Sequence, residues 1–583
     1  MRLNLSSQIV LNKVPVEFYK PKTTVEYSEI SRMEKIHTDI FASMAEGASH
    51  VADKIEAGIK AAQQEGKFYV MALGSGSSLY SVYDELVRRY NEKTLSFRNV
   101  VVFNAYEYYP LQKDSSLRTI NQLKDRFLNH VDVAEQNIFT LDGFVAQDAV
   151  QDSCRLYEQR IKTFGGLDVA LLGVGRSGNI AANEPGSGIQ SMTRIILIGN
   201  TSREEMENSE QTKETIPPCS LTMGIATLLS AKSIYLTAWG EEKAEIMQKV
   251  VENSITDTLP ASFLQTHPNA HVVIDLGAAH HLTRIEHPWL VTSCQWSDKL
   301  VRSALVWLCQ KLGKPILKLT NKDYNENGLS ELLALYGSAY NANIKIFNDL
   351  QHTITGWPGG KPNADDTYRP ERATPFPKKV IVFSPHPDDD VISMGGTIRR
   401  GEARTACTYN EIPLDHVHFL DLPFYESGKI EKLPMTEKDV EIVRALLQKV
   451  QPHQIYVAGD LADPHGTHKK CTDAVLAAID EEKNAGAEWL KDCRIWMYRG
   501  AWAEWEIENI EMCVPLSPEE LRAKRNSILK HQSQMESAPF LGNDERLFWQ
   551  RAEDRNRATA SLYDQLGLAC YEAMEAFVEY KPL

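Results

Sequence analysis

The amino-acid sequence predicts an α/β protein with two Rossmann-like parallel-sheet domains, joined by a helical extension and a Pro/Gly-rich linker. Three observations lead to this prediction. A chain of 583 residues is too long for one hydrophobic core. Apolar runs rich in β-branched residues alternate with helical patterns in both halves of the chain. These runs are continuously apolar, as expected for strands that are covered by helices on both faces.

The first domain is expected over residues 1–290. Its predicted strands should form one parallel sheet, with helices between successive strands. These strands are KFYVMAL (67–73), NVVVF (99–103), DVALLGV (168–174), RIILIG (194–199), SIYLTAW (233–239) and HVVIDL (271–276).

Helical patterns such as DKLVRSALVWLCQKL predict a helical extension over 291–356. Residues 357–377 are rich in proline and glycine and are expected to be a linker. The second domain is expected over 378–583, with another parallel sheet. Its predicted strands are KKVIVFS (378–384), HVHFLDL (416–422), QIYVAGD (454–460) and RIWMYRG (494–500).

The overall composition favours a cytoplasmic enzyme that acts on a small molecule. A formal net charge of −15 argues against non-specific binding to nucleic acid or to an anionic membrane surface. The nine cysteines include no CxxC pair, which fits reduced thiols. No apolar stretch approaches the length of about 18 residues that a membrane span needs.

Acidic residues and histidines gather after two strands of the second domain. His386 and three aspartates follow KKVIVFS, and DPHGTH (463–468) follows QIYVAGD. A catalytic zinc site needs about three nitrogen or oxygen ligands and an open position for water. One histidine and one carboxylate from the first loop, with one histidine from the second, would meet this need. The alternative is that both segments are ordinary polar turns.

This pair of motifs, with Arg399-x-x-Glu402, FLDLP (419–423) and KRNSILKHQSQ (524–534) in the same order, resembles the LmbE/PIG-L family of metal-dependent N-deacetylases over about 376–583. The resemblance implies hydrolysis of an N-acetyl group from an N-acetylglucosamine-type sugar by a divalent metal, zinc in particular. The implied metal ligands are His386, Asp389 and His468. Asp388 would be the general base, His465 would face the oxyanion, and Arg399 would contact the substrate. Asp390 stands where the family usually has glutamate.

One departure from that family concerns the segment after Ser393–Thr397. The family continues through a helix, a strand and a loop before its RxxE helix, whereas IRRGEARTACTY follows at once here. Either the protein lacks this segment, or the sequence closes over a gap between Thr397 and Ile398. We favour the gap, which a Cα separation greater than about 3.8 Å would show.

A second candidate site lies in the first domain, in LGSGSSLYSVYDEL (73–86). Small residues between a buried strand and a helix allow backbone N–H groups to reach an anion at the helix N-terminus. A glycine- and serine-rich turn without a ligand is an equally common use of such a sequence.

Together with FNAYEYYPL (103–111), GVGRSGNIAANEPGSG (173–188) and LTMGIATLLSA (221–231), this stretch resembles glucosamine-6-phosphate deaminase over about 35–290. The resemblance implies binding of a sugar phosphate and formation of a homo-oligomer. The implied phosphate-binding residues are Ser75, Gly76, Ser77, Ser78 and Lys243, and the implied catalytic carboxylates are Glu107 and Glu184.

The catalytic positions match that family only in part. Tyr106 stands at its aspartate, and Arg176, Ser177 and Asn179 stand within its N-D-G-H segment; Asn208 lies near the place of a phosphate-binding arginine. Proton transfer at C2 needs a base with a usable pKa, and the ordinary pKa of tyrosine is about 10. Three alternatives stay open for this half: an altered deaminase or isomerase, a regulatory sugar-phosphate sensor, or a scaffold.

The two resemblances together favour an enzyme of amino-sugar metabolism. Its surest predicted active site is the metal site of the second domain. Glucosamine-6-phosphate deamination as the main activity is an alternative. The expected ligand is an amino sugar or amino-sugar phosphate, with no nucleic-acid or membrane partner.

Overall fold

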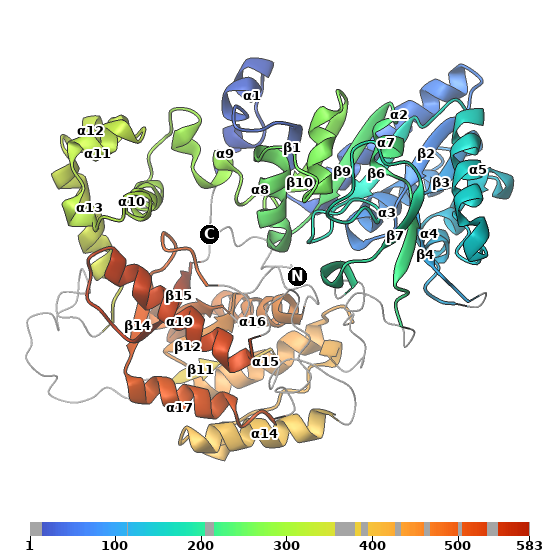
Figure 1. Ribbon diagram of the computed structural model, residues 1–583. Helices are drawn as coiled ribbons and strands as arrows, with labels where there is room; N and C mark the ends of the chain where they lie inside the picture. The colour runs from blue at the N-terminus through green and yellow to red at the C-terminus, as the bar shows by residue number, and fades with distance from the viewer. Residues whose placement is uncertain are drawn as a thin grey trace, which may run out of the picture. The chain divides into compact units, whose positions relative to one another are not determined.

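The computed structural model describes residues 14–112, 115–203, 215–355, 379–385, 395–425, 433–459, 467–499, 504–532 and 546–581 (Figure 1). The chain divides into two compact units, and the boundary falls between Cys294 and Gln295. The N-terminal unit begins at Val14, and the C-terminal unit contains the helices that follow Gln295 as well as the second sheet.

The N-terminal unit is built on a seven-stranded parallel sheet. Its order is β1 (His37–Phe41), β10 (Ala270–Asp275), β9 (Ser233–Ala238), β6 (Val169–Gly173), β2 (Tyr69–Leu73), β3 (Val100–Asn104) and β5 (Ile138–Phe139). Each neighbouring pair is parallel. This confirms the predicted parallel-sheet architecture of the first half.

Helices cover both faces of this sheet. The helices α2 (Met44–Gln64), α3 (Ser77–Asn91) and α4 (Thr119–Arg126) share one hydrophobic core with the sheet, and α5 (Val150–Thr163), α7 (Ile225–Leu229) and α8 (Ala244–Glu252) share the other. In β2, Met71 and Leu73 belong to the first core, whereas Val70 and Ala72 belong to the second. Because both faces of the strand are buried, its sequence is continuously apolar.

The predicted strand RIILIG does not join the parallel sheet. Its residues form β7 (Arg194–Leu197) in a separate antiparallel sheet of order β4 (Tyr106–Tyr109), β8 (Cys219–Thr222), β7. The side chains of Ile195 and Leu197 are exposed, so this strand is covered on one face only. Apolar composition alone could not distinguish such a strand from one that is buried on both faces.

The first part of the C-terminal unit is helical. It consists of α10 (Asp298–Leu312), α11 (Asn321–Glu326), α12 (Ser330–Tyr336) and α13 (Ala339–Gln351). The end of this stretch is tied to the second sheet, because the amide of Thr355 donates to the carbonyl of Cys513 and the hydroxyls of Thr353 and Tyr563 are 2.8 Å apart. The predicted linker at 357–377 lies outside the described residues.

The second sheet is mixed, whereas a parallel sheet was expected. Its order is β11 (Val380–Val382), β12 (Gln454–Ala458), β13 (Arg494–Tyr498), β15 (Ala573–Tyr580) and β14 (Met512–Leu516). The first three strands are parallel, and β15 runs antiparallel to both β13 and β14. Buried and partly buried residues alternate along most of β15, as is common in antiparallel strands. This strand was not among those predicted from the sequence.

The predicted strand HVHFLDL is also absent from the sheets of the described residues. Leu414–His416 form a 3₁₀ turn, and the ring of Phe419 is covered by the guanidinium groups of Arg400 and Arg404. Both arginines belong to α14 (Gly395–Tyr409). Phe419 therefore packs against the charged side chains of a helix. Its apolar side chain is not evidence that the segment is a buried strand of a sheet.

Thr397 and Ile398, between which a gap in the sequence was expected, are consecutive positions of α14. The expected gap stays a prediction.

The remaining described helices of this unit are α15 (Glu437–Val450), α16 (Thr467–Asn484), α17 (Pro518–Ile528) and α19 (Phe548–Gln565). Among the residues that the structure describes, no helix is both long and apolar enough to cross a membrane.

Candidate functional site

The carboxyl ends of β2, β6 and β9 carry the candidate sugar-phosphate site. These three strands are neighbours and parallel, so the segments that follow them emerge at one edge of the sheet. This edge is where open α/β sheets bind their ligands. The three segments contain Gly74–Ser78, Arg176–Asn179 and Glu241–Lys243, respectively.

The first segment is a glycine turn into α3. Gly76 precedes this helix with φ of 152°, a backbone conformation that favours glycine, and no side chain caps the helix N-terminus. A Cβ atom added at Gly76 would meet no atom within 4 Å, so open space lies beside this turn. The turn is anchored by Trp239, whose indole N–H donates to the carbonyl of Ser78 over 2.7 Å.

Tyr106 reaches this same turn. Its hydroxyl lies 2.9 Å from the Ser75 hydroxyl and 3.1 Å from the Ser75 carbonyl oxygen. The residue at the position of the family's aspartate is therefore hydrogen-bonded to the expected phosphate loop. A phenol at this place donates a hydrogen bond where a carboxylate would accept one.

Glu107 belongs to β4 of the antiparallel sheet and is buried. Its side chain is 1% exposed, and Oε1 accepts hydrogen bonds from the amides of Thr119 and Tyr108 at 2.8 and 3.1 Å. Burial raises the pKa of its carboxyl, and the hydrogen bonds from these backbone amides act in the opposite direction. Thr119 is the first residue of α4, so this carboxylate satisfies the N-terminus of a helix. Oε1 of Glu107 therefore holds the start of α4, and the catalytic role expected for this residue stays a prediction.

The segment after β6 forms a tight polar turn. The Ser177 hydroxyl donates to the side-chain oxygen of Asn179 over 2.9 Å and lies 3.2 Å from the hydroxyl of Ser202. Gly178 has φ of 76°, and a Cβ atom there would lie 2.1 Å from Cδ1 of Leu259. The turn that carries these substituted catalytic positions is thus fixed by packing as well as by hydrogen bonds.

Glu184 and Lys243 are both buried. The carboxylate of Glu184 lies against Gly199. A Cβ atom added at Gly199 would be 3.0 Å from Oε2 of Glu184. Lys243 ends the 3₁₀ turn Glu241–Lys243, and Glu242 in that turn is 3.6 Å from the guanidinium of Arg176. This ion pair and the Trp239 hydrogen bond connect the three segments at the edge of the sheet.

Asn208, which lies near the expected place of a phosphate-binding arginine, is outside the described residues.

The predicted metal site of the C-terminal unit is described in part. His386, Asp388, Asp389, Asp390 and His465 lie outside the described residues, and Arg399 is described only as a position in α14. Pro385, which precedes His386, and His468 are described.

His468 occupies the first turn of α16, and its side chain is 7% exposed. The strands that precede the two predicted motifs, β11 and β12, are adjacent and parallel. One turn after His468, the Cys471 sulfur lies 4.0 Å from the carbonyl oxygen of Pro385. The start of the first motif is therefore close to the helix that follows the second.

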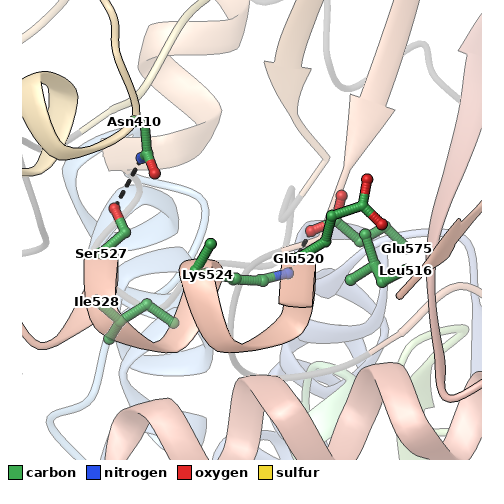
Figure 2. Close-up of a pocket in the computed structure, with 8 residues that line it drawn as sticks. Asn410, Leu516, Glu520, Lys524, Ser527, Ile528 and Glu575 are labelled. Carbon is green, nitrogen blue, oxygen red and sulfur yellow. Dashed lines mark hydrogen bonds and ion pairs between the residues drawn. The ribbon is translucent and has the colours of Figure 1, made fainter. Parts of the chain in front are cut away.

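An open cavity of about 340 Å³ lies elsewhere in the C-terminal unit (Figure 2). Its charged and polar lining is largely paired: Lys524 contacts the carboxylate of Glu575, and the Asn410 side chain donates to Ser527 over 2.8 Å. The predicted metal and phosphate residues are not part of its lining. The lining residues are Asn410, Leu516, Glu520, Ala523, Lys524, Ser527, Ile528 and Glu575.

A third group of ionisable side chains, His37, Asp39 and His271, was not predicted from the sequence. Their candidate ligand atoms all lie within 4.8 Å of one another. They belong to two strands that are distant in sequence, so only the pairing of β1 with β10 reveals the group.

Comparisons with known proteins match the N-terminal half. A family model described as glucosamine-6-phosphate isomerases/6-phosphogluconolactonase matches residues 42–273. A glucosamine-6-phosphate deaminase of Oceanobacillus iheyensis is 32% identical over 43% of this chain and 97% of its own length. A solved structure of a monomeric glucosamine-6-phosphate deaminase is 32% identical and covers 42% of this chain and 99% of its own, with a TM-score of 0.40.

One relative matches along the whole chain. A glucosamine-6-phosphate deaminase-like protein of Bacteroides thetaiotaomicron is 61% identical and covers 100% of both chains. That alignment extends over 663 positions, whereas this chain has 583 residues. The relative therefore contains positions that have no counterpart here.

Proposed function

Because the chain belongs to the family of glucosamine-6-phosphate deaminase-like proteins, we propose that its N-terminal unit binds an amino-sugar phosphate such as glucosamine 6-phosphate. The phosphate would lie against Gly74–Ser78, with Lys243 as a cationic contact. The observation that carries this proposal is the turn at Gly76, which opens α3 without a side-chain cap and faces open space. Such a helix N-terminus attracts a phosphate through its backbone N–H groups and the helix dipole.

Calorimetric titration with glucosamine 6-phosphate tests this binding. Lys243→Ala should weaken binding about tenfold to a hundredfold, because a charge-assisted hydrogen bond contributes about 1.5–3 kcal/mol. Lys249→Ala is the matched control, since Lys249 is an exposed lysine of α8 that pairs with Glu245 at 2.6 Å. A wild-type protein that takes up no sugar phosphate, or equal losses in both variants, would contradict the proposal.

We further propose that this unit binds its ligand without ordinary deamination. Of the family's catalytic carboxylates, Glu107 and Glu184 have counterparts here, but Glu107 holds the start of α4 and Tyr106 is engaged with Ser75. Proton transfer between C1 and C2 of an amino sugar requires a base that faces the ligand. The unit would then serve as a sensor or a delivery site for an amino-sugar phosphate.

Release of ammonia from glucosamine 6-phosphate is the corresponding assay. The wild-type protein is expected to release no more ammonia than its Glu184→Gln variant. Release that disappears in this variant would establish that Glu184 supports deamination despite the substituted positions, and would overturn the binding-only role. Calorimetry on the same samples separates loss of chemistry from loss of binding.

A second proposed activity belongs to the C-terminal unit: metal-dependent hydrolysis of an N-acetyl group from an N-acetylglucosamine-type sugar. The contact between Cys471 and Pro385 supports it, because it brings together the segments that contain the two motifs. His386, Asp389 and His468 would form a donor set of two imidazoles and one carboxylate, which suits zinc. A zinc ion bound there would lower the pKa of a water ligand to about 7.

The other residues of the motifs would act on the substrate. Asp388 would take a proton from the attacking water and return it to the departing amine. His465 would stabilise the developing oxyanion, and Arg399 would bind the sugar. The product of this reaction is an amino sugar, which is the ligand class proposed for the N-terminal unit.

Homo-oligomerisation is also proposed from the family resemblance, and sedimentation velocity measures it directly.

A further inference from the structure

Three histidines surround Asp39 at the edge of the seven-stranded sheet. His37 and Asp39 lie two residues apart on β1 and therefore on one face of the strand, and His37 is the register partner of His271 on β10. Asp39 Oδ1 is 3.1 Å from Nε2 of His37, and Oδ2 is 3.7 Å from Nδ1 of His271. His50, from the facing helix α2, places its Nε2 3.9 Å from Oδ2.

The spacing of three of these groups allows them to close around a metal ion. Metal–ligand bonds of about 2.0–2.1 Å in a tetrahedron separate neighbouring ligand atoms by about 3.3–3.4 Å. One candidate ligand atom from each of His37, Asp39 and His271 lies within 4.8 Å of the other two, so small side-chain rotations would bring these three groups around one ion. His50 lies beside this group, with its Nε2 3.9 Å from Oδ2 of Asp39.

The hydrogen bonds around the group prepare its ligand atoms. Nε2 of His271 lies 3.2 Å from the side-chain oxygen of Asn269. An amide oxygen accepts hydrogen bonds, so this contact is made when Nε2 carries the proton, and a bound metal would then take Nδ1. An outer hydrogen bond of this kind commonly orients a metal-binding imidazole.

The donor types also suit a cation. One carboxylate and two imidazoles are ligands typical of zinc and related divalent ions.

We propose that His37, Asp39 and His271 form a binding site for one divalent ion of the zinc class. The site is separate from the proposed sugar-phosphate site. His37 begins β1 and His271 lies near the start of β10, whereas Gly74–Ser78 follows the carboxyl end of β2. The strands β10, β9 and β6 lie between β1 and β2.

The role of this ion is structural. It joins the edge strand β1 to β10, and three strands separate β1 from β2, which carries the turn proposed to bind the sugar phosphate. Because an ion that binds the folded state alone stabilises that state, the N-terminal unit should unfold at a higher temperature when the site is loaded.

Cobalt(II) titration of the untagged, chelator-treated full chain tests the proposal. The experiment uses the His468→Ala background, so that the separately proposed C-terminal site does not contribute. We expect one Co²⁺ per chain, the intense visible absorption of tetrahedral cobalt and a higher unfolding temperature. All three should be lost when His37→Gln and His271→Gln are added.

The matched control adds His280→Gln and His281→Gln to the same background. These are two adjacent histidines of the same unit outside the group, so they should leave cobalt binding and absorption unchanged. A chain that retains no Co²⁺, or that retains it equally with His37→Gln and His271→Gln, would show a hydrogen-bonded histidine–aspartate group only and overturn the proposal. Neither result depends on deacetylase activity or on sugar-phosphate binding.

Discussion

Replacing His468 with alanine is expected to abolish hydrolysis of N-acetylglucosamine-type sugars by the metal-loaded protein. Only two of the three proposed ligands, His386 and Asp389, would remain, and a divalent ion held by two ligands dissociates readily. The measurement is acetate release from a panel of N-acetylated sugars, together with elemental analysis of the purified chain. Metal content should fall by one ion per chain while any ion at Asp39 is retained.

Two further variants make this result specific. His416→Ala removes an exposed imidazole of the same unit and should keep full activity and metal content. Asp388→Asn should lose activity but keep the metal, because the general base is changed and the ligands are not. Absence of acetate release by the wild-type chain on every sugar, or full activity of His468→Ala, would end the proposal for the C-terminal unit.

Replacing Arg284 with methionine should destabilise the N-terminal unit by about 3–5 kcal/mol, since it leaves a buried carboxylate unpaired. Arg284 is 1% exposed, and its guanidinium lies 2.7 Å from the carboxylate of Glu34, which is 2% exposed. It also donates to the carbonyl of Thr38 over 2.7 Å. Urea unfolding at several pH values measures the loss.

The loss should grow with pH. Burial raises the pKa of Glu34 to about 7, and Arg284 acts against that rise. A carboxyl whose pKa is raised in the folded state contributes stability below its unfolded pKa, and this contribution disappears as the pH rises through the folded value. Arg284→Met should therefore cost less free energy of unfolding at pH 5, where Glu34 is protonated, than at pH 8.

The double variant Glu34→Gln/Arg284→Met is the control for this effect. It removes both charges, so it should be more stable than Arg284→Met at pH 8 and its stability should change less between pH 5 and pH 8. A single variant with the same loss at both pH values would contradict the assignment of the effect to Glu34.

The sheet of the N-terminal unit could be predicted where its strands are buried on both faces. Four of the five confirmed strands of the parallel sheet, β2, β3, β6 and β9, are buried along most of their length. The edge strand β1 was missed, because HTDIF alternates polar and apolar residues and has no continuous apolar run. Its role depends on its register with β10, which is a tertiary property.

The candidate sites show the same limit. The turn at Gly74–Ser78 could be recognised because its residues are consecutive and glycine is required at Gly76. The hydrogen bond from the amide of Thr119 to Glu107 could not be predicted. Thr119 is twelve residues further along the chain and belongs to another element. The histidines near Asp39 were missed for the same reason, since they come from three elements.

The attachment of α10–α13 to the second sheet decides how the protein should be divided for expression. The amide of Ile316 donates to the carbonyl of Leu566 over 3.1 Å, and Ile354 bridges to Cys513. A truncation within the proline-rich stretch after residue 356 would strip these helices from the surface that buries them. A cut between Cys294 and Gln295 keeps each hydrophobic core whole and should yield the better-behaved fragments.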